Sequence, residues 1–348
     1  MSDPASPPAP PRRRPDRSSV TICDVARLAG VSMITVSRAM NTPEQVSEAK
    51  LAKIRAVVDQ LGYVPNRMAG GLKSARSRLV MALVPSLSSQ VFTPTVQALT
   101  EALEQRGYHL MLGQSGYEDS REDHMLEAII GRRPDGIVLT GVLHSQESRK
   151  RLIASGIPVV ETWDYSPSPI DMLVGFSHDR VGEEVCTFLA RQGRRHLALV
   201  TGSDARAMRR RDGFVRSAAR LGLPPPRVAM IAAPATHANA RVALAALLDA
   251  GPPLDAVFCS SDLVALGVLN ELQSRGLSVP GAVAIVGFGD LAYAASMHPS
   301  LSTIRIDGAR LGRLAAELIV QRAEGREVDE PVIDLGFELV ERDSTGGG

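Results

Sequence analysis

The feature that most constrains the fold of this 348-residue chain is a series of apolar segments of strand length beginning at residue 79, with helical periodicity between most of them. Segments that are apolar on both faces are typical of strands in parallel sheets whose two faces are covered by helices. Nine such strands exceed one usual sheet, so the pattern predicts two α/β lobes. The predicted strands are residues 79–85, 109–114, 136–141, 158–163, 172–177, 196–202, 228–233, 256–261 and 283–289.

The net charge of +1 conceals an asymmetry along the chain. Residues 1–78 carry 13 Lys and Arg against 6 Asp and Glu, whereas residues 79–348 carry 26 against 32. A basic front end on an acidic body favours a polyanion partner for the front end only. Residues 1–19 are rich in Pro and Arg, which predicts a disordered, solvated tail, with loose attraction to phosphates as the alternative.

Residues 20–64 have the pattern of a helix-turn-helix domain, with helices predicted at 22–29, 33–40 and 47–61. Gly30 suits the left-handed end of the first helix, and Ser32 is a favourable N-cap for the second. The N-terminal residues of such a second helix enter the major groove of DNA. The segment therefore predicts a DNA-binding domain.

Helical spacing places Met33, Ile34, Ser37 and Arg38 on the outward face of that second helix. Arg38 can donate two hydrogen bonds to a guanine, and the two apolar side chains can contact a thymine methyl group. The hydroxyls of Thr35 and Ser37 suit phosphates. The alternative is that Met33 and Ile34 belong to a core and that Arg38 is only a surface charge.

Groove exposure of Met33 and Ile34 is favoured because other apolar residues already fill the inner face. These are Val25, Ala29, Val31 and Val36.

At this point the chain resembles the lactose/galactose-repressor family of bacterial transcription regulators. The resemblance rests on Ile22-x-Asp-Val-Ala-x-x-Ala-Gly-Val-Ser-x-x-Thr-Val-Ser-Arg-x-x-Asn41, followed by Val46-Ser47 and Leu61-Gly-Tyr-x-Pro-Asn66-x-x-Ala69. Together with the pattern above, it implies DNA contacts from Thr21, Ser32, Met33, Ile34, Thr35, Ser37, Arg38, Asn41, Tyr63, Asn66, Arg67, Ala69, Leu72 and Lys73.

The resemblance also implies a hinge helix at 67–74, which folds when two protomers meet in the minor groove. Leu72 stands where the family wedges a leucine into the central base step, although an ordinary linker leucine is the alternative. The pair Gly70-Gly71 departs from the family and weakens this helix, by about 2 kcal/mol relative to two alanines.

In the body, ligands of open parallel sheets bind where strands end. The strand exits are residues 86–92, 114–117, 163–165, 176–178, 203–211, 260–262 and 288–290. Three family motifs fall at such exits: Arg210-Arg-Asp-Gly-Phe214, whose arginine binds the effector in the family, Ser261-Asp262-Leu-Val-Ala-Leu-Gly267, and Gly287-Phe-Gly-Asp290. In the last motif, Gly289 replaces an Asp that holds hydroxyls in sugar-binding members.

These residues favour an acidic effector over a neutral sugar. The guanidinium of Arg210 fits a carboxylate or phosphate in two parallel hydrogen bonds, and Gly289 removes a carboxylate that would repel an anion. Residues 163–177 also resemble the subgroup of gluconate-utilisation repressors, so the predicted effector is gluconate or a phosphorylated relative. The predicted contacts are Ser88, Gln90, Phe92, Trp163, Phe176, Arg210, Ser261, Asp262, Phe288 and Asp290.

Several of these contacts have a structural alternative. Arg210 could form a structural ion pair, and Asp262 could cap the helix that follows it. Trp163 and Phe288 could fill the core instead of stacking on a sugar.

The sequence as a whole predicts a homodimeric, ligand-responsive repressor with an all-α headpiece and a body like that of periplasmic binding proteins. The predicted divisions are a tail at 1–19, a helix-turn-helix domain at 20–64, a hinge at 65–78 and an effector-binding and dimerisation domain at 79–348. Within the last, the N-lobe comprises about 79–176 plus 305–328, and the C-lobe about 177–304 plus 329–345. The resemblance implies that tetrameric members carry a C-terminal heptad tail, and this sequence shows none. We therefore expect a dimer and hence a near-palindromic operator.

Two other classes of protein are less favoured. A solute-binding receptor shares the two-lobed body, but it would need an export signal and no basic headpiece. A sugar-acid enzyme would need a catalytic motif, and we find none. Cys23, Cys186 and Cys259 have neither metal nor disulfide spacing. We therefore expect no metal or cofactor, no membrane span, and a cytoplasmic, nucleoid-associated location.

Overall fold

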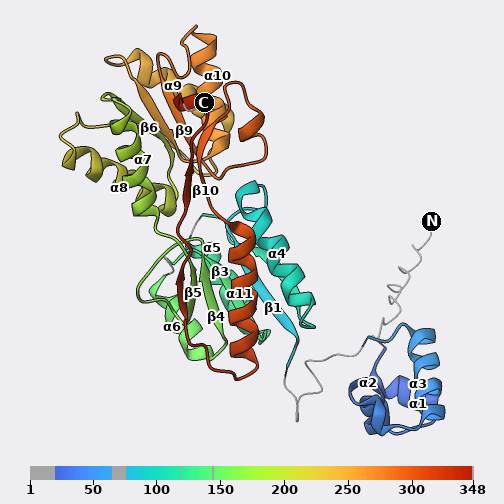
Figure 1. The fold of residues 1–348 in the computed structure, drawn as a ribbon. Helices are drawn as coiled ribbons and strands as arrows, with labels where there is room; N and C mark the ends of the chain where they lie inside the picture. Colours follow the sequence, from blue (N-terminus) through green and yellow to red (C-terminus); the bar gives the residue numbers. More distant parts are fainter. Residues whose placement is uncertain (1–19, 65–75, 118, 143–144, 347–348) are drawn as a thin grey trace, which may run out of the picture. The chain divides into compact units, whose positions relative to one another are not determined.

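The computed structural model describes residues 20–64, 76–117, 119–142 and 145–346, and the chain divides into Met1–Arg76 and a body, Ser77–Gly348 (Figure 1). Two segments predicted from the sequence, the tail at 1–19 and the hinge helix at 67–74, lie outside the described residues. The same holds for the predicted DNA contacts Asn66, Arg67, Ala69, Leu72 and Lys73.

The headpiece, residues 20–64, consists of helices packed around a small apolar core, and it has the predicted helix-turn-helix arrangement. The first helix ends at Gly30, whose φ of +64° is the left-handed cap expected there. Ser32 accepts a hydrogen bond from the Thr35 amide at 3.2 Å and so starts the second helix. The helices are α1 (Ile22–Ala29), α2 (Met33–Asn41), a 3₁₀ turn (Pro43–Gln45) and α3 (Glu48–Leu61). The buried core is Val25, Ala26, Ala29, Val36, Ala39 and Ile54.

The body contains two six-stranded sheets, which confirms the prediction of two α/β lobes. The N-lobe sheet has the order β11-β5-β4-β3-β1-β2, and the C-lobe sheet has the order β12-β10-β9-β8-β6-β7. All pairings are parallel except that of β10 with β12. The N-lobe strands are β1 (Leu79–Val84), β2 (His109–Gln114), β3 (Gly136–Thr140), β4 (Val159–Thr162), β5 (Met172–Gly175) and β11 (Val332–Asp334). The C-lobe strands are β6 (Leu197–Gly202), β7 (Arg227–Ile231), β8 (Ala256–Cys259), β9 (Ala284–Phe288), β10 (Ser302–Arg305) and β12 (Glu338–Val340).

Helices cover both faces of each sheet, as the apolar strands require. In the N-lobe, α4 and α11 pack against each other on one face (Figure 1), and α5 and α6 cover the other. In the C-lobe, α7 and α8 form the tightest helix pair, and α9 and α10 pack together on the opposite face. The helices are α4 (Thr93–Glu104), α5 (Asp119–Ile130), α6 (Gln146–Ser155), α7 (His178–Arg191), α8 (Ala205–Arg220), α9 (His237–Asp249), α10 (Asp262–Ser274) and α11 (Gly308–Ala323).

The chain passes between the lobes three times, and one crossing differs from the prediction. The first two crossings follow β5 and β10, close to the predicted positions. The third lies between β11 and β12, because β11 pairs with β5 in the N-lobe sheet. Assigning residues 329–334 to the C-lobe is therefore wrong, and the boundary moves to about residue 335. A three-residue strand carries too little pattern to reveal which sheet it joins.

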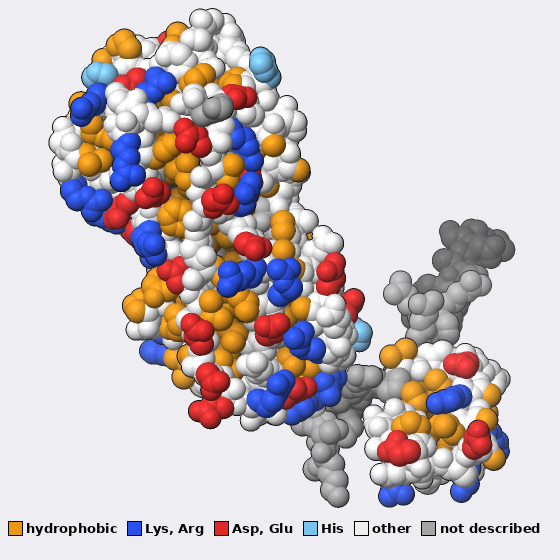
Figure 2. All heavy atoms as spheres, in the orientation of Figure 1, with side chains coloured by type: hydrophobic (Ala, Val, Ile, Leu, Met, Phe, Trp, Pro, Cys, Tyr) orange, Lys and Arg blue, Asp and Glu red, His pale blue; other side chains and the backbone are white. Residues whose placement is uncertain are grey.

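Within the described residues, no helix combines the length and apolar character that a bilayer crossing requires. Acidic and basic side chains are interspersed over the face of the body that Figure 2 shows. The excess of acidic residues in the body therefore does not form one large acidic patch on that face.

Candidate functional site

The outward face of α2 exposes apolar side chains beside a cation. Met33 is 51% exposed and Ile34 is 66% exposed, and Arg38 is also exposed. On the opposite face, Val36 and Ala39 are buried in the headpiece core. The two apolar residues therefore lie outside the core of the headpiece, which leaves them available to a partner.

The other described residues predicted to contact DNA lie on or next to α2, at the start of α1 and after α3. The Ser32 hydroxyl lies 2.9 Å from that of Thr35, and the Asn41 side-chain amide donates to the Ser37 carbonyl at 3.0 Å. Tyr63 is half-buried and packs against the headpiece core. The hydroxyl of Thr21 and its backbone N–H both donate to Asp24, and these two hydrogen bonds lower the pKa of that carboxyl.

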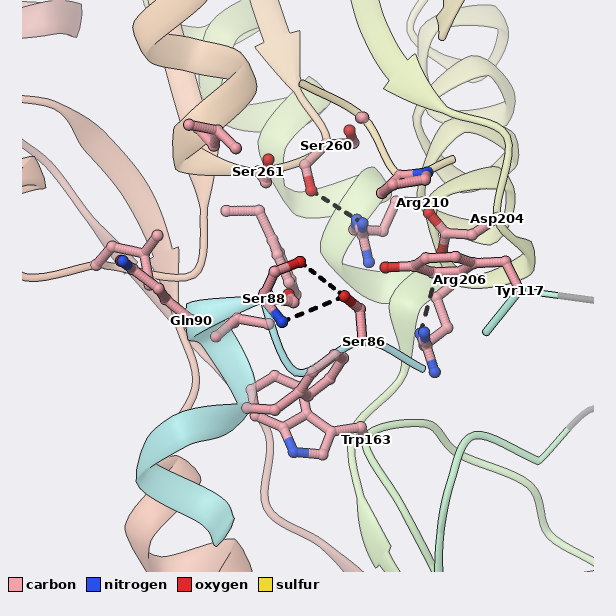
Figure 3. A pocket seen from close by; sticks show the side chains of 18 of the residues that line it. Ser86, Ser88, Gln90, Tyr117, Trp163, Asp204, Arg206, Arg210, Ser260 and Ser261 are labelled. Carbon is pink, nitrogen blue, oxygen red and sulfur yellow. Dashed lines mark hydrogen bonds and ion pairs between the residues drawn. The ribbon is translucent and has the colours of Figure 1, made fainter. Parts of the chain in front are cut away.

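A cavity of about 250 Å³ lies in the body, lined by residues that follow strands of both lobes (Figure 3). Cavities of this size suit a ligand smaller than a typical drug. Most of the residues predicted to contact an effector line it, namely Ser88, Gln90, Phe92, Trp163, Arg210, Ser261 and Phe288.

The structure places three predicted residues behind or beside the cavity. Phe176 is fully buried behind Trp163 and Phe288, with ring centroids 5.9 and 6.3 Å away. Asp262 is buried and accepts hydrogen bonds from the Thr303 hydroxyl and the Leu291 amide, so it supports a loop of the cavity wall. Ser261, rather than Asp262, caps the following helix.

Asp290 lies in a neighbouring groove and does not line the cavity. Its carboxylate is paired with Arg305 at 2.6 Å and Arg342 at 2.7 Å, which joins β9 to β10 and to the segment after β12. Asp290 and Phe176 therefore do not reach the cavity directly. Their place in the fold is structural.

Arg210 projects from α8 into the cavity with most of its surface withdrawn from water. Nη2 donates to the Ser260 carbonyl at 3.1 Å, and Nη1 donates to Nδ1 of His178 at 2.9 Å. The guanidinium lies 4.0 Å from the centroid of the Phe288 ring. Burial lowers the pKa of Arg210 to about 10, so the side chain stays charged at neutral pH.

His178 holds Arg210 in place as a neutral imidazole. Burial, reinforced by the charge of Arg210, depresses the pKa of His178 well below its usual value. Because Nδ1 accepts from Arg210, Nε2 carries the proton and donates to the Trp163 carbonyl at 2.9 Å. The α7 and α8 helices that carry the pair pack closely, since Gly182 of α7 faces the Arg210 carbonyl.

Aromatic rings form the floor of the cavity. Trp163 donates from Nε1 to the Thr95 hydroxyl at 3.1 Å and contacts Phe92 edge-on at 5.1 Å. Trp163 thus serves both alternatives weighed for it, because it lines the cavity and packs in the core. An apolar floor beneath charged walls is typical of sites for polar small molecules.

Sequence reasoning omitted several lining residues from the predicted site. Asp204 and Arg206 lie in the strand exit 203–211, Tyr117 in 114–117, Ser86 in 86–92 and Ser260 in 260–262. The strand exits were correctly predicted to form the site, but the sequence does not reveal which side chain of each exit points into the cavity. Tyr293 lies beyond the exits considered, and burial raises its pKa to about 12. The described residues hold no cluster of three potential metal ligands.

Comparisons with known proteins agree with this architecture. Residues 21–66 match the family described as bacterial regulatory proteins, lacI family, and residues 186–345 match a periplasmic binding protein-like domain. The HTH-type transcriptional regulator GntR of Pseudomonas aeruginosa is 36% identical over 327 residues, which cover 93% of this chain and 95% of that protein. Its namesake in Escherichia coli is 34% identical over 317 residues, covering 91% and 96%.

Solved structures show the same similarity over nearly the whole chain. A LacI-family transcriptional regulator from Silicibacter pomeroyi is 32% identical with a TM-score of 0.88, covering 94% of this chain and 99% of that one. The lac repressor dimer, solved with operator and the anti-inducer ONPF, is 25% identical with a TM-score of 0.78, again covering 94% and 99%.

Proposed function

The chain belongs to the lacI family of bacterial regulatory proteins and is a transcription regulator, and we propose that it represses genes of sugar-acid catabolism as a homodimer on a near-palindromic operator. The exposed face of α2 carries the proposal. Met33 and Ile34 are apolar yet exposed, and Arg38 beside them can form two hydrogen bonds to guanine. DNA contact explains why such side chains are turned to solvent.

The edge strands of the body support a dimer. β2 and β7 lie at the edges of the two sheets, and both expose apolar side chains. An unpaired, partly apolar edge favours association with another surface. The exposed residues are Met111, Leu112, Val228 and Met230.

The cavity supports an acidic sugar derivative as the effector. It brings two arginines, several hydroxyl side chains and an aromatic floor together. Relatives of the chain include regulators named GntR and IdnR, and a similar solved structure, the transcriptional regulator CelR, contains a sugar, cellobiose. We propose that cavity occupancy controls the ordering of residues 67–74 at the operator. This requires that the effector bind the operator-bound and the free states of the protein with different affinity. We place the protein in the cytoplasm.

The experiment is a gel shift with an operator selected from a random duplex pool, followed by calorimetry with gluconate, 6-phosphogluconate and galactose. We expect tight, salt-dependent binding to a near-palindrome and heat from an acid. Equal affinity for selected and random duplex contradicts the regulatory proposal. Binding of galactose alone contradicts the acid effector and leaves DNA binding intact.

A further inference from the structure

The cavity contains a second arginine, Arg206, that no sequence motif singled out. We propose that Arg206 selects the acid group of the effector, so that a polyhydroxy acid with one negative charge binds in preference to its neutral isostere and to a phosphate ester. This inference rests on the proposed acid effector and assigns its carboxylate to one side chain.

Arg206 is withdrawn from water but weakly paired. Its side chain is 14% exposed, and Nη1 donates to the Thr140 carbonyl at 3.2 Å. Nε lies 4.0 Å from the Asp204 carboxylate, at the limit of an ion pair (Figure 3). A guanidinium has five N–H donors, so among the described residues most of those on Arg206 remain available to a ligand.

The nearest carboxylate is committed elsewhere. Asp204 is the N-cap of α8, where it accepts the Ala207 amide at 3.1 Å. An N-cap carboxylate is stabilised by the amide and by the positive end of the helix dipole. Asp204 can therefore remain in place when a ligand carboxylate approaches Arg206 from the cavity side.

Arg210 has fewer donors available than Arg206. Its terminal nitrogens already bond to His178 and to the Ser260 carbonyl, and its face lies on Phe288. Nε of Arg210 is buried and has no hydrogen-bond partner among the described residues. Of the five donors on Arg210, two are therefore bonded and one is enclosed. Arg206 uses one donor, on the Thr140 carbonyl, and retains enough donors for a two-bond contact with a carboxylate.

The charge of the cavity matches one anion. Among its described lining residues, Arg206 and Arg210 are positive, Asp204 is negative, and His178 is neutral because burial lowers its pKa. The remaining charge of +1 balances one carboxylate. A phosphate ester adds roughly −1.5 to −2 at neutral pH, which exceeds that balance.

The same side chain connects the lobes. Arg206 belongs to α8 of the C-lobe, while Thr140 ends β3 of the N-lobe, and the guanidinium carbon lies 5.6 Å from the Phe92 ring centroid. A carboxylate held by the remaining donors of Arg206 would therefore lie beside a contact between the lobes. Recognition of the acid and contact between the lobes meet at one residue.

The experiment compares gluconate with gluconamide, in which a neutral amide replaces the carboxylate, by calorimetry on the full-length chain. We expect Arg206→Gln to weaken gluconate binding about 10- to 100-fold, the effect of losing hydrogen bonds to a charged group. Gluconamide affinity should change by less than about threefold. Arg206→Lys should restore part of the preference for the acid, because it keeps the charge without the planar fork.

Arg151→Gln is the matched control, since Arg151 lies on α6 and pairs with Glu127 and Glu147 at the surface. It should keep the wild-type ratio of gluconate to gluconamide affinity. Unchanged thermal unfolding and operator binding without effector would show that Arg206→Gln is folded. If that variant unfolds, Arg206→Lys decides through the same ratio.

The outcomes separate this inference from the proposed function. If the wild-type chain binds gluconate and both Arg206 variants keep the wild-type ratio, the inference is overturned and the acid effector stands. Tighter binding of 6-phosphogluconate than of gluconate overturns the preference for a single charge. If the wild-type chain binds no acid, the proposed acid effector and the proposed role of Arg206 both fail.

Discussion

The headpiece and the body present their candidate functional side chains in opposite ways. In the headpiece, apolar Met33 and Ile34 are exposed, whereas in the body a cation, Arg210, is buried. Each is the reverse of what is usual for its residue type, since apolar side chains are usually buried and arginines exposed. An exposed apolar residue costs its own domain little. A buried cation needs hydrogen bonds and tight packing around it.

The body should therefore be the more sensitive of the two to changes in packing. A Cβ added at Gly182 of α7 would lie 1.9 Å from the Arg210 carbonyl oxygen and 2.7 Å from the Phe214 amide nitrogen. Backbone atoms cannot yield as a flexible side chain does. We expect Gly182→Ala to lower the free energy of unfolding of the body by about 3 kcal/mol, the upper range for overpacking.

Urea denaturation followed by tryptophan fluorescence measures this effect, because the single tryptophan, Trp163, lies in the body. Gly131→Ala is the control, since its added Cβ would have its nearest neighbour at 3.5 Å. Equal stability of the two variants would contradict the close approach of α7 and α8. It would also contradict the greater sensitivity of the body, compared with the headpiece, to changes in packing.

The headpiece should respond in affinity instead of stability. Arg38 is exposed on α2, so Arg38→Ala should leave folding unchanged and weaken binding to the selected operator by about 1–3 kcal/mol. Binding to random duplex should fall much less. Gel shifts with both duplexes measure the difference.

Arg38→Lys distinguishes base recognition from a phosphate contact, because lysine keeps the charge and loses the two-bond geometry. We expect it to bind the selected operator almost as weakly as Arg38→Ala does. Full recovery of affinity by the lysine variant would make Arg38 a phosphate contact only.

The same contrast explains what the sequence predicts well. In the headpiece, Gly30 and Ser32 mark helix ends by local chemistry, and the structure begins and ends α1 and α2 within a residue of the prediction. In the body, nine apolar runs mark nine strands. Three further strands, β10, β11 and β12, are only four, three and three residues long, which is too short for an apolar pattern to mark them.

The cavity is harder to predict because its residues come from many segments. The family motif identified Arg210, but Arg206, one helical turn earlier, has no motif of its own. Whether it points inward depends on where Asp204 starts α8 and on the packing of α7 against it. Those are tertiary facts that no local pattern contains.

Proton binding tests the buried polar site of the body. The pKa of His178 is depressed in the folded state. Below about pH 6.5 the imidazole of His178 is therefore protonated in the unfolded chain but remains neutral in the folded chain. Its contribution to stability is therefore present above that pH and is lost as the pH falls. The slope approaches about 1.4 kcal/mol per pH unit.

His178→Gln should lose stability less steeply than the wild type between pH 7 and pH 5, in urea denaturation at half-unit steps. His196→Gln is the control, because His196 is exposed. Parallel curves for the wild type and His178→Gln would mean that His178 is protonated in the folded state. The hydrogen bond from Arg210 would then need another acceptor.

The smallest expected effect concerns a headpiece residue with two possible roles. Ser32 caps α2 through the Thr35 amide, and it is also a predicted DNA contact. Ser32→Ala should cost about 1 kcal/mol of helix stability, seen as about fivefold faster hydrogen exchange of the α2 amides in the full-length chain. Asparagine caps helices as well as serine, so Ser32→Asn should restore the wild-type exchange rate.

If operator affinity recovers along with the exchange rate, Ser32 acts by shaping the helix, and the exposed side chains beyond it recognise the bases and phosphates. If exchange recovers and affinity does not, the hydroxyl itself touches DNA, and the headpiece also relies on a side chain held within its own fold, as the body does with Arg210.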